Sequence, residues 1–191
     1  MRSTGFQSLI IIMMNLKYLL AAILNENKAA DTLYRANKEF FKEFFMPSLC
    51  VYRDFFRALV AAALARETIG WARRKRIREA RRLYGKLEAQ LIYCPDNIVN
   101  KLYLINAELE FCRGRYTTAL LKYQKSIFFA KRERLRLDHA LACEKAGRML
   151  HQAGRYSESV QFTQQARELY LSWGALVKVN QIDAFIVSTK S

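Results

Sequence analysis

The sequence predicts an all-α protein, an α-solenoid of about four antiparallel helix hairpins followed by a short C-terminal capping helix. Glycine and proline are scarce, at 7 and 2 of 191 residues, whereas sandwiches, barrels and doubly wound folds need frequent tight turns. Apolar residues recur three or four positions apart, as on one face of a helix. The tripeptide Gly-Arg-Tyr at residue 114 returns 40 residues later, which indicates stacked supersecondary units. With 52% apolar residues, we expect one domain over residues 1–191.

The first two hairpins are expected at about 6–45 and 47–91. Asn25 supplies the first turn, because asparagine tolerates the left-handed backbone conformation. Pro47 separates the two hairpins and suits the first turn of the helix that follows it. The second turn falls at residues 67–70, ahead of a helix that we expect to run from 71 to 91.

The third and fourth hairpins, at about 96–131 and 137–171, contain the repeat. Gly114 and Gly154 suit the left-handed position that ends a helix. Small residues at matching distances around each glycine let the paired helices approach closely. A last helix at about 175–187 would cover the open end of the stack. The residues expected to define the repeat are Ala107, Gly114, Tyr116, Ala119, Gly147, Gly154, Tyr156, Ala166, Trp173 and Gly174.

The Gly-x-Tyr turns and their flanking small residues resemble the tetratricopeptide repeat, with longer units. The order of motifs between residues 94 and 183 is similar to that in the helical-repeat region of large multi-domain signalling proteins. Those proteins also carry a protein-kinase-like domain and an AAA-type predicted ATPase domain, often with a GAF sensor and a histidine kinase. The motifs in question are Cys94-Pro95-Asp96-Asn97, Gly114-Arg115-Tyr116 and Tyr170-Leu171-Ser172-Trp173-Gly174-Ala175.

This resemblance implies a non-catalytic module for protein–protein contact or domain spacing in a signal-transduction assembly. Its partner would be another protein, or signalling domains linked to it in a longer gene product. The sequence lacks the phosphate-binding loop and the kinase motifs of those proteins, so no catalytic residue is implied. The alternative that the chain is a fragment of a larger ATPase or kinase signalling protein stays open.

In a solenoid of this type, the first helix of each pair lines a concave groove. We therefore expect a partner groove formed by the third and fourth hairpins. The candidates for its rim are Leu102, Tyr103, Asn106, Glu110, His139, Glu144 and Arg148.

A basic run at residues 73–82 is the sharpest charge feature, with seven cations opposed only by Glu79. The run carries +6 of a formal net charge of +15. It comprises Arg73, Arg74, Lys75, Arg76, Arg78, Arg81 and Arg82. Three interpretations stay open: a solvated helix face, a contact for an acidic protein or anionic lipid, and sequence-blind contact with nucleic-acid phosphates. The alternative function is thus a basic helical adaptor for nucleic acid or an anionic membrane.

No motif for catalysis or metal binding stands out. His139 and Cys143 are four residues apart and could share a helix face, but no third ligand accompanies them. We expect no enzyme activity, cofactor, metal or small-molecule substrate. Four cysteines without a Cys-x-x-Cys pair favour a reducing, cytoplasmic location. The apolar stretch 9–24 leaves open a signal peptide or membrane anchor, although Lys17 interrupts it.

Overall fold

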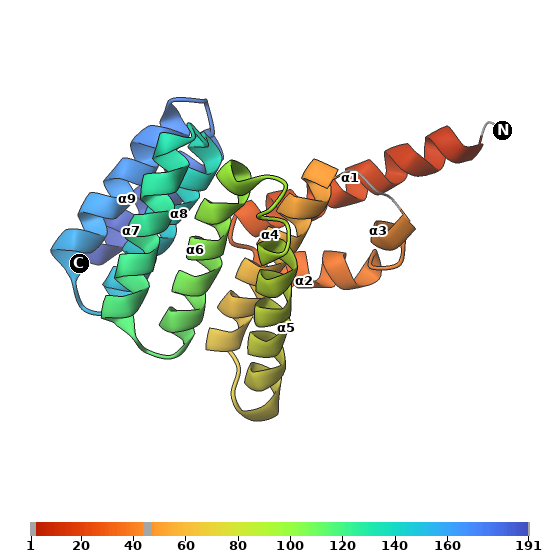
Figure 1. Cartoon of the computed structure of the whole chain (residues 1–191). Helices are drawn as coiled ribbons and strands as arrows, with labels where there is room; N and C mark the ends of the chain where they lie inside the picture. Colours follow the sequence, from red (N-terminus) through yellow and green to blue (C-terminus); the bar gives the residue numbers. More distant parts are fainter. Residues whose placement is uncertain (1–2, 44–46, 191) are drawn as a thin grey trace. The chain divides into compact units, whose positions relative to one another are not determined.

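The computed structural model describes the backbone of residues 3–43 and 47–190, and their regular secondary structure is entirely helical (Figure 1). The all-α prediction is therefore confirmed for the described residues. The helices are α1 (Ser3–Ile23), α2 (Asn27–Ala36), α3 (Phe40–Glu43), α4 (Pro47–Arg66), α5 (Gly70–Glu88), α6 (Pro95–Cys112), α7 (Tyr116–Arg132), α8 (Arg136–Gln152), α9 (Tyr156–Leu171) and α10 (Leu176–Lys190).

The chain divides into two compact units, unit 1 at residues 1–87 and unit 2 at residues 88–191. The single continuous domain expected over residues 1–191 stays a prediction. Each unit has its own set of packed helices and its own buried polar groups, and each is described by itself below.

The first helix of unit 1, α1, contains the apolar stretch 9–24. Ile11, Asn15, Tyr18 and Ala22 are buried and recur three or four residues apart, so they share one face of the helix. The side-chain amide of Asn15 makes a hydrogen bond within the helix, from Nδ2 to the carbonyl of Ile11 at 3.0 Å. Every helix in the described part of the chain falls short of the length and apolarity that crossing a bilayer needs.

Helices α1, α2 and α4 pack against one another in unit 1. The aromatic rings of Tyr18, Tyr34 and Phe41 lie 5.5–6.3 Å apart between centroids. The Tyr18 hydroxyl donates to the carbonyl oxygen of Arg53 at 3.2 Å, so its one polar group is satisfied. Burial raises the pKa of Tyr18 well above its usual value. The rings therefore form an apolar core with a hydrogen-bonded edge.

The first hairpin, expected at about 6–45 with its turn at Asn25, contains a further break that the sequence did not predict. Helix α2 ends at Ala36 and α3 begins at Phe40. Both the backbone N–H and the side-chain amide of Asn37 donate to the carbonyl of Leu33, at 3.2 and 2.8 Å. Because this side chain competes with the helical backbone bonds, the helix stops there. The expected end of the hairpin, at residue 45, lies outside the described residues.

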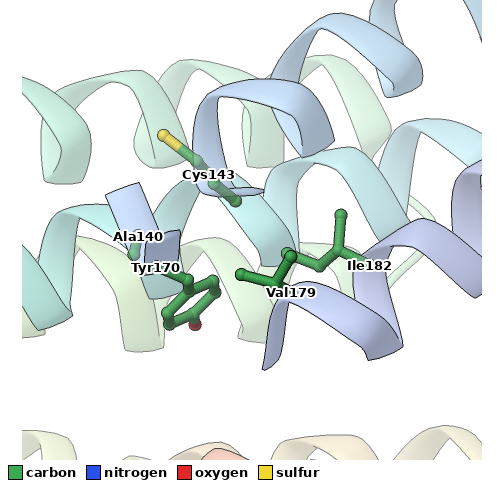
Figure 2. Close-up of a cluster of buried hydrophobic side chains, with 6 residues drawn as sticks. Ala140, Cys143, Tyr170, Val179 and Ile182 are labelled. Carbon is green, nitrogen blue, oxygen red and sulfur yellow. The ribbon is translucent and has the colours of Figure 1, made fainter. Parts of the chain in front are cut away.

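Unit 2 comprises α6 to α10, in which each helix packs on the next and α6 also packs on α8 (Figure 1). A buried apolar cluster joins the last three helices (Figure 2). It combines Ala140 and Cys143 of α8, Ala166 and Tyr170 of α9, and Val179 and Ile182 of α10. This cluster makes α10 an integral part of the unit.

The turns of unit 2 share one backbone geometry. Gly114 and Gly154 have φ of +72° and +73°, the left-handed conformation that the sequence predicts. In each turn this residue's N–H donates to the carbonyl three residues back, and the next N–H donates to the carbonyl five residues back, as in the Schellman motif. The turns at Gly174 and Arg134 follow the same pattern. Arg134, with φ of +56°, escaped prediction because it is not a glycine.

Two buried ion pairs connect alternate helices of unit 2. Lys101 Nζ of α6 lies 2.5 Å from Asp138 Oδ2 of α8, with both side chains 1% exposed. Lys178 Nζ of α10 lies 2.7 Å from Glu144 Oε2 of α8. The Tyr170 hydroxyl also donates to Glu144, at 3.0 Å. Since an unpaired buried charge is costly, these pairs set which residues of α6, α8 and α10 face one another.

Gly147 lies at a close contact between α8 and α9. A Cβ atom built on it would stand 2.5 Å from Thr163 Cγ2 and 3.1 Å from the Ser159 carbonyl oxygen. Although alanine favours a helix over glycine by about 1 kcal/mol, we expect Gly147→Ala to lower the free energy of unfolding by about 1–3 kcal/mol through overpacking. Urea denaturation followed by circular dichroism would measure the change.

The matched control for this substitution is Gly85→Ala. Gly85 is exposed on α5 and a Cβ there meets nothing within 4 Å, so its substitution should be neutral or stabilising. Adding Thr163→Ser to Gly147→Ala removes the clashing methyl group and keeps the hydroxyl, so stability should largely return. Unchanged stability in Gly147→Ala would contradict the close approach.

Candidate functional site

The basic run lies on α5, and its cations divide into two groups. Lys75, Arg78 and Arg82 are exposed, as are Arg74 and Arg81. Arg73 and Arg76 are less exposed. Ala80, Leu83 and Leu87 form the buried side of the same helix. The run is therefore a largely solvent-facing charged surface on an anchored helix.

Part of this surface lines a groove of about 570 Å³ within unit 1. Helix α5 provides one wall, with residues spaced at i, i+4, i+7 and i+11, while α2, the residues after it and α4 provide the rest. The lining residues are Tyr34, Arg35, Lys38, Arg57, Trp71, Lys75, Arg78, Glu79 and Arg82. Six of these nine carry a positive charge and one is a carboxylate.

The groove is supported by an ion-pair network centred on Arg57, whose side chain is only 1% exposed. Arg57 Nη1 donates to Asp31 Oδ1 at 2.6 Å, and Nε donates to Glu79 Oε1 at 2.7 Å. Arg76 adds a bidentate pair with Asp31, at 2.6 and 2.8 Å. The guanidinium of Arg57 also lies 4.4 Å from the centroid of the Tyr34 ring. This network fixes α2, α4 and α5 to one another.

The charges of the network determine the protonation state of Asp31. Burial would raise the pKa of Asp31, but hydrogen bonds from Arg76 and Arg57 outweigh burial and hold the pKa well below its usual range. Burial likewise disfavours the charged form of Arg57, but Glu79 and Asp31 outweigh it and raise the pKa. Asp31 and Arg57 are therefore both charged at neutral pH.

The cations of the groove exceed its carboxylates. Counting the lining residues together with Arg76 and Asp31 gives seven cations against two carboxylates, a surplus of five. Both carboxylates are engaged by Arg57 and Arg76. Lys38, Arg78 and Arg82 make no ion pair or side-chain hydrogen bond with the described residues. The groove thus presents unneutralised positive charge.

Trp71 is the exposed aromatic residue of the groove, at 68% of its surface. It lies in the first turn of α5, and Lys75 Nζ stands 5.0 Å from the centroid of its ring. A large apolar ring left in solvent beside cations is typical of a contact surface. A second hollow of about 500 Å³, lined by Arg74, Ile77, Arg78 and Arg81, adjoins the same helix.

The seven residues expected at the groove rim of unit 2 differ in their exposure to solvent. Leu102, Glu110 and Glu144 are buried, which corrects the expectation that their side chains face a groove. Glu110 pairs with Arg113, and Glu144 pairs with Lys178, so their carboxylates are engaged inside the fold. The remaining four are partly exposed: Tyr103, Asn106, His139 and Arg148.

The surroundings of Glu144 show why it lies inside. Burial would raise its pKa, but Lys178 and Arg148 outweigh burial and lower the pKa, so Glu144 stays ionised. Arg148, which is partly exposed, donates from Nε to the Glu144 carboxylate at 3.1 Å. Two of the residues expected at a rim therefore form a structural ion pair instead.

His139 and Cys143 do not form a reactive pair. Burial raises the pKa of the Cys143 thiol to about 12. Burial lowers the pKa of His139, and the positive charge of Lys131 lowers it further. The Cys143 thiol donates a long hydrogen bond to Gln165 Oε1, at 3.8 Å. In the described part of the chain, no group of three or more His, Cys, Asp or Glu side chains is placed to hold a metal ion.

Sequence reasoning missed the groove residues outside the basic run. Tyr34, Arg35 and Lys38 come from α2 and the residues after it, and Arg57 comes from α4. One signal was available, because Arg57 stands in an otherwise apolar segment and a buried arginine needs carboxylate partners. The identity of those partners, 22 and 26 residues away, is a property of the tertiary structure.

Comparison of the chain with protein-family models, with curated proteins and with solved structures found no match. The described residues define an all-helical protein with a cationic groove in unit 1. The likeness to the repeat regions of signalling proteins rests on the sequence motifs alone.

Proposed function

We propose that the chain is a non-catalytic binding module built from helical repeats, and that its partner is a polyanion held by the basic face of α5. The observation that carries the proposal is the convergence of Lys38, Lys75, Arg78 and Arg82 on one groove. The nearby carboxylates are engaged by Arg57 and Arg76, so these exposed cations remain available to an external anion. A concentrated positive surface attracts anionic partners and speeds their association.

The repeat architecture of unit 2 supports the first half of the proposal. Turns at Gly114 and Gly154 have the same hydrogen bonds 40 residues apart, and buried Lys–carboxylate pairs connect α6 to α8 and α8 to α10. These features suit tetratricopeptide-like antiparallel hairpins in an α-solenoid, with α10 as the capping helix. Such units give a rigid scaffold on which a binding surface can be carried.

The state of the reactive groups supports a non-catalytic role. The Cys143 thiol is buried with a raised pKa, which disfavours the nucleophilic thiolate. The Glu144 and Asp138 carboxylates are buried in ion pairs with lysines. These groups contribute to the stability of unit 2 and leave the exposed charges of unit 1 as the surface for a partner.

Binding of a fluorescent heparin oligosaccharide tests the proposal with two variants of equal charge. The groove variant is Lys75→Gln/Arg78→Gln/Arg82→Gln. The control variant is Lys125→Gln/Lys131→Gln/Arg136→Gln, which removes three exposed cations of unit 2. We expect the groove variant to lose about tenfold or more in affinity and the control to change by less than about threefold. Equal losses would show that net charge alone attracts heparin, and the proposal would be wrong.

A second candidate is protein contact or domain spacing through unit 2, as the sequence resemblance implies. Leu121 and Phe128 of α7 are 56% and 60% exposed and lie seven residues apart, so they form an apolar stripe. Tyr103 of α6 stacks on Phe129 of α7, with ring centroids 5.4 Å apart and ring planes at 5°. A partner docked on this face would respond weakly to salt, whereas a polyanion in the groove would respond steeply.

A further inference from the structure

We infer that the groove of unit 1 takes single-stranded nucleic acid, with one base stacked on Trp71 and the adjoining phosphates on Lys38, Arg78 and Arg82. The inference rests on the proposed function and names the class of polyanion. Two observations carry it. One is the exposed indole ring of Trp71, and the other is that Arg78 and Arg82, on the same helix, make no ion pair with the described residues.

The indole ring provides the stacking surface. Trp71 is 68% exposed, and Lys75 is its cationic neighbour at 5.0 Å. Tyr34, the other aromatic residue of the groove, is engaged by Arg57 and lies against Tyr18 and Phe41. Trp71 is therefore the ring available to a ligand. Proteins that bind single strands combine such a ring with a basic groove, because every base has an aromatic face.

The cations provide a track for the sugar–phosphate backbone. Trp71, Lys75, Arg78 and Arg82 recur at i, i+4, i+7 and i+11 on α5, so they form a line of about 16 Å along the helix axis. Lys38, from the residues after α2, lines the same groove. The ion pairs of Arg57 with Asp31 and Glu79 hold the walls together, so the track exists before a ligand arrives.

The shape of the site favours a single strand over other polyanions. A groove of about 570 Å³ lies within the range of pockets that enclose part of a ligand. A duplex keeps its bases stacked inside, whereas a single strand can splay a base onto an aromatic ring. A membrane surface would contact the exposed cations without needing an aromatic ring in line with them.

The test uses the full chain with Trp173→Phe, so that Trp71 is the tryptophan that fluoresces. Titration with a twelve-nucleotide oligouridine should quench this fluorescence, because a base stacks on the ring. Followed by the fluorescence anisotropy of a labelled oligouridine, Trp71→Ala should weaken oligouridine binding by about 5- to 150-fold, which is the loss of one stacking contact. The same substitution should change heparin affinity by less than about twofold. Trp71→Phe should retain an intermediate affinity for oligouridine.

The outcomes separate this inference from the proposed function. If Trp71→Ala leaves oligouridine binding unchanged while the groove variant loses both ligands, the inference is wrong and the proposed function stands. If neither heparin nor oligouridine binds the wild-type chain, both are wrong. Tighter binding of a twelve-base-pair RNA duplex, or of phosphatidylserine vesicles, than of oligouridine would also overturn the inference. Circular dichroism of Trp71→Ala checks that α5 remains folded.

Discussion

Replacing Lys178 with methionine should lower the free energy of unfolding of unit 2 by about 3–5 kcal/mol, because the buried Glu144 carboxylate then lacks its lysine partner. Glu144 is completely buried, and Lys178 approaches it at 2.7 Å from α10. The Tyr170 hydroxyl and Arg148 remain as partners, and of these two Arg148 carries a compensating charge. Denaturation of a Trp71→Phe background would follow unit 2 through Trp173, whose ring lies 6.0 Å from Tyr170.

A matched control removes a more exposed ion pair, which joins α9 to α10. Arg167 and Asp183 contact each other at 2.6 Å, but their side chains are 37% and 45% exposed. Arg167→Met should therefore change stability little. Adding Glu144→Leu to Lys178→Met removes both buried charges and should recover part of the loss. If Lys178→Met and Arg167→Met had similar small effects, the structural role of the buried pair would be contradicted.

Asp31→Asn should lower the free energy of unfolding of unit 1 by about 3 kcal/mol at pH 7, because the buried Arg57 keeps only Glu79 as a charged partner. Asp31 accepts hydrogen bonds from Arg57, Arg76 and Arg35. An asparagine preserves the shape of the side chain and removes its charge. In a Trp173→Phe background, Trp71 reports the unfolding of unit 1 during urea denaturation.

The same substitution should change the response of unit 1 to acid. The folded-state pKa of Asp31 is lowered, so its stabilising effect is fully present above the unfolded-state value of about 4 and is lost as the pH falls below it. Asp31→Asn should flatten this decline between pH 5 and pH 3. Glu67 forms an exposed ion pair with Lys28 at 4.0 Å, so Glu67→Gln should leave the acid-induced decline in stability unchanged. An unaltered decline in Asp31→Asn would assign the acid sensitivity to other groups.

The sequence predicted the features of this fold that depend on neighbouring residues. Periodic apolar residues indicated the helices, and most of their ends lie within about three residues of the expected positions. Gly114 and Gly154 take the left-handed conformation expected of them, since that choice depends on the residue itself. The break in the helix at Asn37 was missed because its side chain competes with helical bonds that the pattern alone favours.

Contacts between distant residues could not be predicted in the same way. Glu144 belongs to a helix whose polar residues would ordinarily face solvent, yet Lys178, 34 residues further along, pairs with it inside. The basic run was evident, but its function as one wall of a groove depends on Lys38 and Arg57 from other segments. No spacing rule connects these positions, because only tertiary packing places them together.

The central claim is that exposed cations of unit 1 bind a polyanion, and the salt dependence of heparin affinity tests it most directly. Binding through charge releases counterions, so affinity should fall by about tenfold or more between 50 and 200 mM salt. The Lys75→Gln/Arg78→Gln/Arg82→Gln variant should show a clearly shallower fall than the wild-type chain. An affinity that is insensitive to salt, or a fall that is equally steep in both proteins, would contradict the claim.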